Sequence, residues 1–265
     1  MFFHEYPITD VFDFIGAAGL DGIEFWVETP HFWVRDLPIE ELLACIASHQ
    51  NLTPITIHAP ILDLNPCSIN PGVAALSLSN ILCSVEIAKQ AAADMVTVHP
   101  GRRTAKRTPS SVDYERFERL IQTLRDATHR TGISIGIENM EPQINSLLHT
   151  PEDTRDLLDR EPWLKFTLDT AHALSKDLES AFTYIDLCFD RLVNIHVSSV
   201  KDGRKHLPIH GDPAIAMILE DLAHRGYSGH LTLEIEDLNF GYEASAEEKI
   251  VLLRREREFM RQYFG

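Results

Sequence analysis

The sequence of 265 residues is poor in cysteine and has no long apolar run. Its four cysteines, Cys45, Cys67, Cys83 and Cys188, are scattered and form no Cys-x-x-Cys pair, which is typical of reduced, mostly buried thiols in a reducing compartment. No stretch approaches the ~20 apolar residues of a membrane span, and the first residues lack the basic start and cleavage site of a secretory signal. We therefore expect a cytoplasmic chain with no membrane partner.

Basic residues are also scarce, because 24 Lys and Arg stand against 40 Asp and Glu and give a net charge of −16. Such a surface repels a polyanion, so the composition disfavours nucleic acid as a partner unless a local basic patch exists. The only candidate patch is the segment Arg102–Arg107. We interpret it as a solvated loop or as a clamp for one anionic group.

The sequence has no glycine-rich phosphate loop after an early strand, which argues against an open doubly wound sheet that binds a dinucleotide. It has no linker, low-complexity tract or shift in composition. With 44% hydrophobic and 24% charged residues, it is typical of a soluble globular protein. We expect one domain over residues 1–265.

Short β-branched runs alternate with longer segments of helical periodicity along the chain. The strand-like runs cover 22–26, 55–58, 95–99, 133–138, 166–169, 192–197 and 231–235, and the helical segments include 73–92, 112–130, 214–225 and 246–264. This alternation predicts parallel strands joined by helices, and eight units of roughly 30 residues fit a (β/α)8 barrel. Seven strands are clear.

The first strand of such a barrel is the weak point of this prediction. Only Met1–Tyr6 precedes the helix that starts near Thr9, so we expect the first strand to be short or truncated, or the natural start to lie upstream. The segment from Ala246 to Phe264 is expected to close the barrel against the first strand, with the run Arg254–Glu258 as its solvated face. No helix is apolar enough all round to indicate an obligate oligomer interface.

Ionisable side chains recur at the carboxyl ends of the predicted strands, where barrel enzymes place their active sites. A single one is most simply a satisfied core residue, but six strands share the feature, and such groups are costly to bury without a partner. Clustered carboxylates also repel one another unless a cation lies among them. We therefore predict a divalent metal site. The residues are His58, His99, Glu138, Asp169 followed by His172, His196 and Glu234.

The donor set narrows the choice of metal. Two glutamates, one aspartate and one histidine suit Mn²⁺, Mg²⁺, Zn²⁺ or Co²⁺. His58 and His99 would add nitrogen ligands for a second ion, for which imidazole favours Zn²⁺, and Glu138 would bridge the two. One ion and two ions both remain open.

Taken in order, the motifs resemble those of the xylose isomerase-like barrel superfamily. This group contains sugar isomerases, epimerases, related dehydratases and the endonuclease IV family of apurinic-site nucleases. The matching pieces run from near residue 20 to 237. They are Asp21-Gly22-Ile23-Glu24, His58-Ala59-Pro60, Asp63-Leu64-Asn65-Pro66, His99-Pro100-Gly101, Ile137-Glu138-Asn139, Leu168-Asp169-Thr170-Ala171-His172, Asn194-Ile195-His196-Val197, His206-Leu207-Pro208, Gly226-Tyr227 and Leu233-Glu234.

The resemblance implies that Glu138, Asp169, His196 and Glu234 hold a metal shared by both branches of the superfamily. In the nuclease branch, the positions of His58 and His99 bind a second zinc. The positions of His172 and His206 bind a third, together with an aspartate two residues before the latter. Arg204 stands at that aspartate position here, and because an arginine cannot lose its proton, we expect the third zinc site to be absent unless Asp202 replaces it.

The function that this pattern favours is a metal-dependent isomerase or epimerase acting on a small sugar or related hydroxy-carbonyl compound. Removal of a proton next to a carbonyl leaves an enediolate that needs a Lewis acid beside it. Glu138 and Glu234 are the predicted catalytic residues, one taking the proton and the other, or a water, returning it. We expect His172, His206, Arg204, Lys201 and Trp26 to contact the substrate.

Three alternatives stay open. An endonuclease IV-like enzyme acting on abasic DNA is favoured by His58, His99 and the segment Arg102–Arg107, and disfavoured by the net charge and by Arg204. A related dehydratase would share the first half of the isomerase mechanism. A non-catalytic barrel would keep the metal for stability or ligand binding. Glu24 either orients a ligand histidine or pairs with an arginine, and the aromatic residues around Trp26 either wall a sugar pocket or form a local core.

Overall fold

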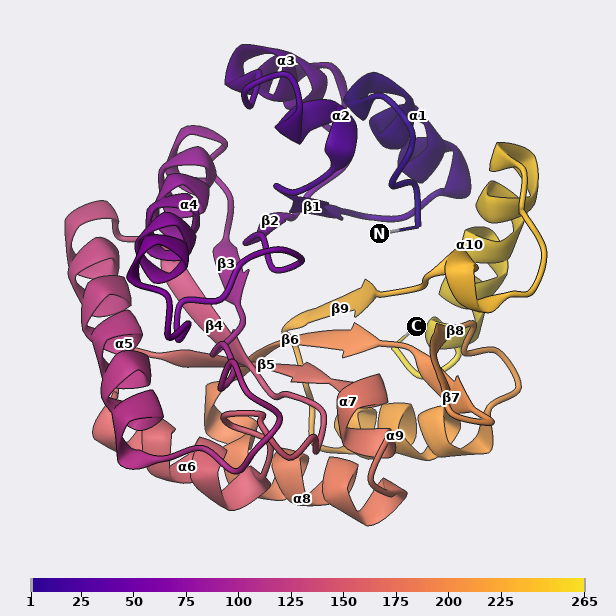
Figure 1. Ribbon diagram of the computed structural model, residues 1–265. Coiled ribbons are helices and arrows are strands. Elements are labelled where there is room, and N and C mark those ends of the chain that lie inside the picture. The colour runs from indigo at the N-terminus through magenta and orange to yellow at the C-terminus, as the bar shows by residue number, and fades with distance from the viewer. Residues whose placement is uncertain (1, 265) are drawn as a thin grey trace.

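The computed structural model describes residues 2–264 and consists of a parallel sheet curled into a barrel inside a ring of helices (Figure 1). Seven parallel strands form this sheet in the order β1-β2-β3-β4-β5-β6-β9, and the hairpin β7–β8 stands apart from it. The seven predicted strands are thus confirmed. Their bounds are β1 Ile23–Trp26, β2 Ile55–His58, β3 Met95–Val98, β4 Ser134–Glu138, β5 Lys165–Asp169, β6 Leu192–Val197, β7 Ser199–Lys201, β8 Arg204–Leu207 and β9 His230–Leu233.

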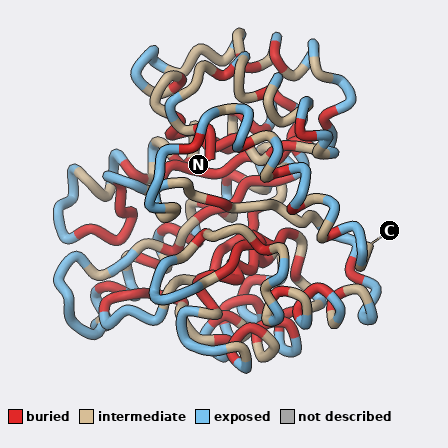
Figure 2. Tube along the Cα trace, turned by 90° about the vertical axis from the view of Figure 1, so that its right-hand side faces the viewer, coloured by how far each residue is buried: buried red, intermediate tan, exposed pale blue. Residues whose placement is uncertain are grey.

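Helices cover the outside of the barrel and bury their apolar faces against it. Figure 2 shows the buried positions concentrated along the strands and the inner sides of the helices, with exposed positions on the outer loops. The helices are α1 Ile8–Ala18, α2 Pro30–Trp33, α3 Ile39–Ser48, α4 Pro71–Gln90, α5 Ser111–Thr131, α6 Pro151–Arg160, α7 Thr170–Leu174, α8 Leu178–Cys188, α9 Pro213–His224 and α10 Ala246–Met260, with short 3-10 turns η1 Phe189–Arg191 and η2 Asp237–Asn239.

Local sequence fixes where several helices begin. In α4, α6 and α9 a proline occupies the first turn, where its missing N–H costs nothing. The residue before each proline, Asn70, Thr150 or Asp212, accepts a hydrogen bond from a free backbone N–H of that turn. These caps end the loops above the barrel at defined points, so each loop is fixed both at its strand and at its helix.

The predicted first strand is not present among residues 2–264, since Phe2–Tyr6 forms turns rather than a strand. The sheet therefore ends at β1 on one side and at β9 on the other. A cleft of about 630 Å³ runs between these two edges and is also lined by residues of α1 and α10. The barrel is nearly closed, and α1 lies beside this opening without a preceding strand.

Helix α10 takes a different position from the predicted one, because it packs against α1 and the N-terminal turn instead of a first strand. The ammonium of its Lys249 donates to the carbonyl of Phe2 at 2.8 Å and pairs with Asp237 at 2.7 Å. The expectation of a fully solvated face is wrong at Glu256, which is completely buried. Its carboxylate accepts bonds from the backbone N–H groups of Ile209 and His210, which satisfies its charge in the interior.

Two further predictions about composition can be compared with the structure. All four cysteines are free, and only Cys83 is not buried, as expected. Helix α4, by contrast, is long and apolar enough to cross a membrane by length and composition, with a mean hydropathy of 1.4, which the sequence reading had excluded. In the barrel it packs on β2, β3 and α5. A single helix of this kind is weak evidence of a membrane span, because outer helices of such barrels meet the same criterion.

Candidate metal centre

The ionisable strand-end residues meet inside the mouth of the barrel. Alternate residues of a strand face the same side, so residues two apart form two successive interior layers. The deeper layer holds Glu24, Thr56 and Asn194, and the side chains of Thr56 and Asn194 both donate hydrogen bonds to the carboxylate of Glu24. The next inward-facing residues of the same strands form the layer at the mouth, and they include His58 and His196.

Four side chains of this upper layer form one potential metal site. One ligand atom each from Glu138, Asp169, His196 and Glu234 lies within 4.8 Å of the others. Two ligands on opposite sides of one ion are about 4.4 Å apart, given metal–ligand distances near 2.2 Å, so the group needs little contraction to bind a cation. These are the four residues that the sequence predicted as metal ligands.

Three further groups share members with the first or lie next to it. His58, His99 and Glu138 form one, with the Nε2 atoms of the two histidines 3.4 and 3.1 Å from Glu138 Oε2. Glu24, His58 and His196 form another, and Asp169, His172 and His206 form a further one, which we call the third donor group. Glu138 and Asp169 thus each belong to two groups, as bridging ligands do. His58 and His99, which the sequence suggested as ligands of a second ion, thus lie together beside Glu138.

The third donor group differs from what the sequence suggested. We expected no such site because Arg204 replaces an aspartate, yet Asp169, His172 and His206 still converge without it. Arg204 is exposed on β8, and its guanidinium donates to the carbonyl of Asn239 at 3.3 Å. Asp202, the other residue considered there, is exposed in the β7–β8 turn. Three donor side chains, those of Asp169, His172 and His206, are therefore available here, and the aspartate that would add a fourth is replaced by Arg204.

Buried polar atoms that lack a hydrogen-bond partner indicate whether a cation would fit this site. Both carboxylate oxygens of Glu138, Oδ2 of Asp169, Oε2 of Glu234 and both ring nitrogens of His196 are buried and make no aligned hydrogen bond. Buried polar groups are otherwise almost always satisfied. A divalent ion would satisfy several of these atoms at once, because they surround a common point. The residues present therefore fit a divalent metal.

The charges of the site are strongly coupled. Although burial opposes ionisation, His99 and His196 lower the pKa of Glu138 well below its ordinary value, and His196 and His206 do the same to the pKa of Glu234. Burial, reinforced by the negative charge of Glu234, raises the pKa of Asp169 well above its usual range. One carboxyl is thus forced toward its neutral form when only protein charges are present, which is the signature of a site short of positive charge.

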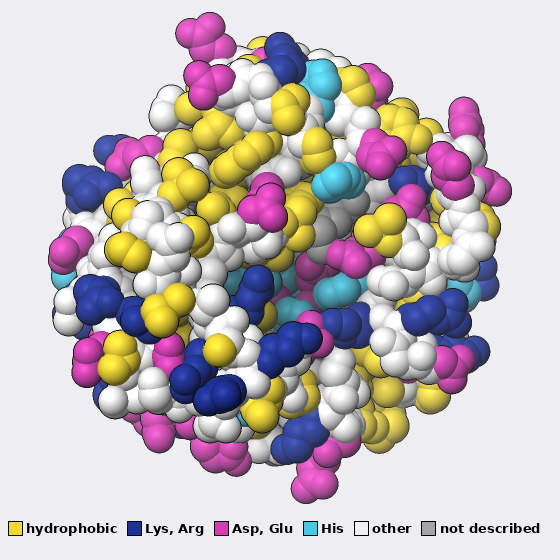
Figure 3. All heavy atoms as spheres, viewed as in Figure 1, with side chains coloured by type: hydrophobic (Ala, Val, Ile, Leu, Met, Phe, Trp, Pro, Cys, Tyr) yellow, Lys and Arg dark blue, Asp and Glu magenta, His cyan; other side chains and the backbone are white. Residues whose placement is uncertain are grey.

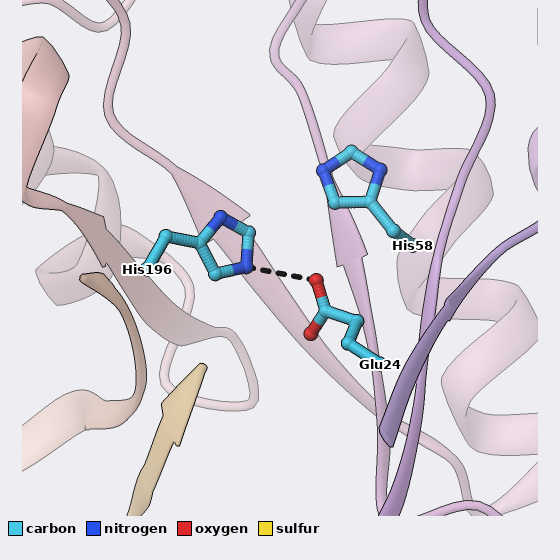
Figure 4. A group of neighbouring side chains, drawn as sticks. All are labelled: Glu24, His58 and His196. Atoms are coloured by element: carbon cyan, nitrogen blue, oxygen red, sulfur yellow. Dashed lines mark ion pairs between the residues drawn. The ribbon is translucent and has the colours of Figure 1, made fainter. Parts of the chain in front are cut away.

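The carboxylate of Glu24, in the deeper layer, contacts the imidazole ring of His196 (Figure 4). Glu24 Oε1 lies 2.8 Å from His196 Nε2, out of line with a straight hydrogen bond. The other oxygen accepts bonds from Thr56 Oγ1 and Asn194 Nδ2, each at 2.9 Å. A carboxylate at Nε2 favours the proton there and leaves the Nδ1 lone pair facing Glu234, 2.9 Å away. Of the two roles considered for Glu24, the structure therefore shows the orienting one.

Backbone carbonyls orient two more histidines. His58 Nδ1 lies 2.7 Å from the carbonyl of Ala59, and His172 Nδ1 lies 2.8 Å from the carbonyl of Asn139. Each carbonyl fixes a proton on Nδ1 and leaves Nε2 free as a ligand atom. The carboxylate of Glu138 raises the pKa of His58 even though burial opposes it, whereas burial dominates at His99 and lowers its pKa.

The predicted substrate contacts occupy different parts of the mouth. His172 and His206 lie in the third donor group, beside the metal ligands. Lys201 and Arg204 are exposed on the β7–β8 hairpin. Trp26 is buried at the end of β1, stacks on His4 with centroids 5.5 Å apart and lines the cleft between β1 and β9, and its indole Nε1 has no partner. Nearby Phe25 and Phe32 belong to the apolar core.

Sequence reasoning gave no role to Asn139, which proves central to the geometry. Its side chain joins the ends of β4 and β5, donating to the carbonyl of Asp169 and accepting from the backbone N–H of the same residue at 2.7 Å. Its own carbonyl orients His172. The available signal was a polar residue directly after a strand-end ligand. Asn194 and Thr56 carried a similar signal, a polar side chain two residues before a ligand histidine.

Comparison with known proteins identifies the family. A family model described as xylose isomerase-like TIM barrel matches residues 12–263. The chain belongs to the xylose isomerase-like TIM barrel family. This confirms both the resemblance seen in the motifs and the predicted fold class.

Members of the xylose isomerase-like family with similar sequences include proteins with and without a described activity. An uncharacterized protein of Methanocaldococcus jannaschii, MJ1188, is 30% identical over 98% of this chain and 96% of its own length. Fructoselysine 3-epimerase of Shigella flexneri is 24% identical over 86% of this chain and 85% of its own. The crystal structure of a 3-keto-D-glucoside 4-epimerase from E. coli superimposes with a TM-score of 0.76 at 18% identity, covering 96% of each chain. Distant relatives of the chain are therefore sugar epimerases.

Proposed function

We propose that the protein is a divalent-metal-dependent sugar isomerase or epimerase that removes a proton from the carbon next to a carbonyl. The observation that carries this proposal is the convergence of Glu138, Asp169, His196 and Glu234, whose ligand atoms lie within 4.8 Å of one another. The names of distant sugar epimerases support the substrate class.

The two glutamates approach the site from different directions. Glu138 ends β4, whereas Glu234 follows β9 at the edge of the sheet, and two strands, β5 and β6, lie between β4 and β9 in the strand order. A carboxylate that gives one oxygen to a cation keeps the other for proton transfer. Both oxygens of Glu138 and one of Glu234 lack a protein partner. Each glutamate can therefore face one side of a substrate that lies between them.

The surroundings keep both glutamates able to accept a proton. Their pKa values are lowered by neighbouring histidines in spite of burial, so both are ionised at neutral pH. Glu234 is the more accessible, with 17% of its side chain exposed against 1% for Glu138. We infer that Glu234 takes the proton from one side of the carbon, and that Glu138, after taking up a proton from solvent, gives that proton to the opposite side, which is an epimerisation. If Glu234 instead gave its proton to the neighbouring carbon, the reaction would be an isomerisation.

The remaining residues bind and orient. Asp169 and His196 would hold the cation together with the two glutamates. When bound, it supplies a Lewis acid that stabilises negative charge on the carbonyl oxygen as the proton leaves. His172 and His206, whose rings are 5.8 Å apart, are placed to donate hydrogen bonds to substrate hydroxyl or carbonyl oxygens. Because both histidines lie next to Asp169, a substrate must come close to the metal ligands to contact them.

Solvent exchange tests the proposal directly. Metal-free protein is loaded separately with Mn²⁺, Co²⁺, Zn²⁺ or Mg²⁺ and incubated in deuterated water with D-fructose, D-tagatose and D-psicose. We expect NMR to show deuterium entering the carbon next to the carbonyl, whereas a dehydratase would instead produce a deoxy dicarbonyl compound, the ketose less one water. Glu234→Gln should reduce exchange by at least about 10³-fold, because the base is lost. Glu243→Gln, exposed outside the site, is the matched control, and exchange that survives Glu234→Gln would contradict the proposal.

A second candidate is an apurinic-site nuclease, favoured by the three donor groups that share Glu138 and Asp169. Phosphodiester cleavage uses several neighbouring ions to bind the attacking and leaving oxygens. Arg204 at the place of a predicted ligand and the net charge of −16 oppose it. Incubation of the metal-loaded protein with a duplex that contains one abasic site decides the matter, since efficient metal-dependent nicking would reverse the ranking.

A further inference from the structure

Two segments at the mouth of the barrel are rich in basic residues although the chain as a whole is acidic. Segment 99–110, between β3 and α5, contains four basic and no acidic residues, and segment 199–207, the β7–β8 hairpin, contains three basic residues and one acidic residue. Figure 3 shows Lys and Arg side chains gathered along the lower rim of a central hollow in which histidines and carboxylates are visible. The rim of the site is thus positive although the chain carries a net charge of −16.

The loop that follows β4 connects the two basic segments. The side chain of Asn145 donates to the carbonyl of Arg103, and the backbone carbonyl of Asn145 accepts from the N–H of Arg103. Arg102 forms an isolated antiparallel β-bridge with Ser146. On its other side, Lys205 of the hairpin forms a tight ion pair with Glu141 of the same loop. The two segments therefore face one region, and the single carboxylate between them is already neutralised by a lysine.

Arg102, unlike Arg103, has no carboxylate partner for its charge among the described residues. Arg103 pairs with Asp113 at 3.6 Å and donates to the carbonyl of Thr108. The backbone of Arg102 is fixed by Asn65, which accepts from its N–H and donates to its carbonyl. Within residues 2–264 its guanidinium pairs with no carboxylate. An arginine on a fixed backbone with an unpaired guanidinium is suited to bind a planar or tetrahedral anion.

A small cleft joins Arg102 to the metal centre. It is lined by the loops after β2, β3 and β4, including His99, Asn65, Arg102, Glu141 and Gln143, and has a volume of about 100 Å³. His99 Nε2 lies 3.1 Å from Glu138 Oε2, so one wall of the cleft is itself a candidate metal ligand. This volume is well below the ~300–1,000 Å³ of pockets that hold drug-sized ligands, so the cleft suits one small charged group rather than a nucleotide.

Building on the proposed function, we propose that this cleft binds an anionic group, a phosphate or a carboxylate, at the end of the sugar remote from the carbonyl. Arg102 is the specificity-determining residue, and Gln143 and Asn65 provide uncharged polar surface beside it. The substrate is thus an acidic ketose rather than a neutral one. A polyanion such as DNA is a different occupant, and the size of the cleft argues against it.

Three ketoses that differ only at carbon six test this proposal: D-fructose, D-fructose 6-phosphate and D-fructuronate. With the metal-loaded protein, we expect the kcat/KM of solvent-deuterium exchange for one charged ketose to exceed that for D-fructose by roughly tenfold to a hundredfold, the range for a charge-assisted contact. Arg102→Ala should abolish this preference and leave D-fructose within about twofold. Arg102→Lys should recover part of it, because a lysine keeps the charge and loses the bidentate geometry.

Arg107→Ala is the matched control, since Arg107 is an exposed residue of the same segment and does not line the cleft. Equal turnover of all three ketoses, or an equal loss for all three in Arg102→Ala, would overturn the proposal and leave the epimerase function intact. Titration of the metal-free protein with inorganic phosphate, followed by NMR, separates the two ideas. Phosphate binding that depends on Arg102 in a protein that exchanges no ketose would support the cleft and refute the proposed function. Binding that is the same in wild type and Arg102→Ala would refute the cleft.

Discussion

Replacement of Glu24 by glutamine tests the most specific feature of the metal centre, the carboxylate beneath His196. The side chain of Glu24 is 7% exposed, and its Oε1 lies 2.8 Å from His196 Nε2. Its Oε2 accepts from Thr56 and Asn194. Glutamine has the same shape but only one accepting oxygen. If that oxygen serves Thr56 and Asn194, the amide NH₂ faces His196 Nε2, and the ring proton must move to Nδ1.

A proton on Nδ1 removes the lone pair that faces Glu234, and with it one ligand of the metal. If the amide turns the other way, its NH₂ meets two donors instead, which is also unfavourable. Loss of such an outer carboxylate typically costs 10- to 100-fold in metal affinity. We therefore expect Glu24→Gln to weaken metal binding by about 1.4–2.7 kcal/mol. Thr56→Val, which removes one donor but keeps the carboxylate, should cost only a few-fold.

The assay is competition between metal-free protein and a fluorescent chelator for Mn²⁺ and Zn²⁺, with the melting temperature measured in parallel. Glu40→Gln, on the exposed face of α3, controls for the loss of one negative charge. Metal affinity of Glu24→Gln within twofold of wild type, with an unchanged melting temperature, would show that Glu24 does not orient His196. The same result would remove the physical argument for Nδ1 as the ligand atom.

Three further predictions follow from other contacts. The pKa of His196 in the metal-free protein is raised well above 6.5, despite burial, by Glu24, Glu234 and Glu138. Because a metal binds only the unprotonated ring, metal affinity should increase with pH up to that raised pKa. Calorimetry in two buffers of different ionisation enthalpy should detect proton release on metal binding, and its absence would contradict the assignment of His196 as a ligand. A Cβ on Gly22 would lie 2.2 Å from the carbonyl oxygen of Pro54, so Gly22→Ala should destabilise the fold by ~1–3 kcal/mol in urea titrations, whereas Gly16→Ala, with open space in α1, should be neutral or stabilising. Amide hydrogen exchange should be faster in β1 and β9, which end the sheet, than in β3, β4 and β5, which are paired on both sides; equal protection would mean that the two edges are covered in solution.

Several features of the site could be predicted because they depend on periodicity and on local rules. Strands separated by helices are parallel, so their carboxyl ends share one face, and a ligand-type residue at each end must lie near the others. The same reasoning predicts that Glu138, Asp169, His196 and Glu234 lie together. It does not predict that Asp169, His172 and His206 also converge, because an arginine at position 204 says nothing about whether Asp169 can serve two groups.

The sequence by itself thus determined the barrel class, its seven clear strands and the residue types that meet at its mouth, since each depends on neighbours along the chain. Only the tertiary structure decided which nitrogen of each histidine faces the centre, which carboxylates are bridging, and that Glu256 is buried rather than solvated. Those outcomes depend on contacts between residues far apart in sequence, such as Glu24 with Asn194 or Glu256 with His210. The closeness of packing sets their distances, and no pattern along one segment encodes it.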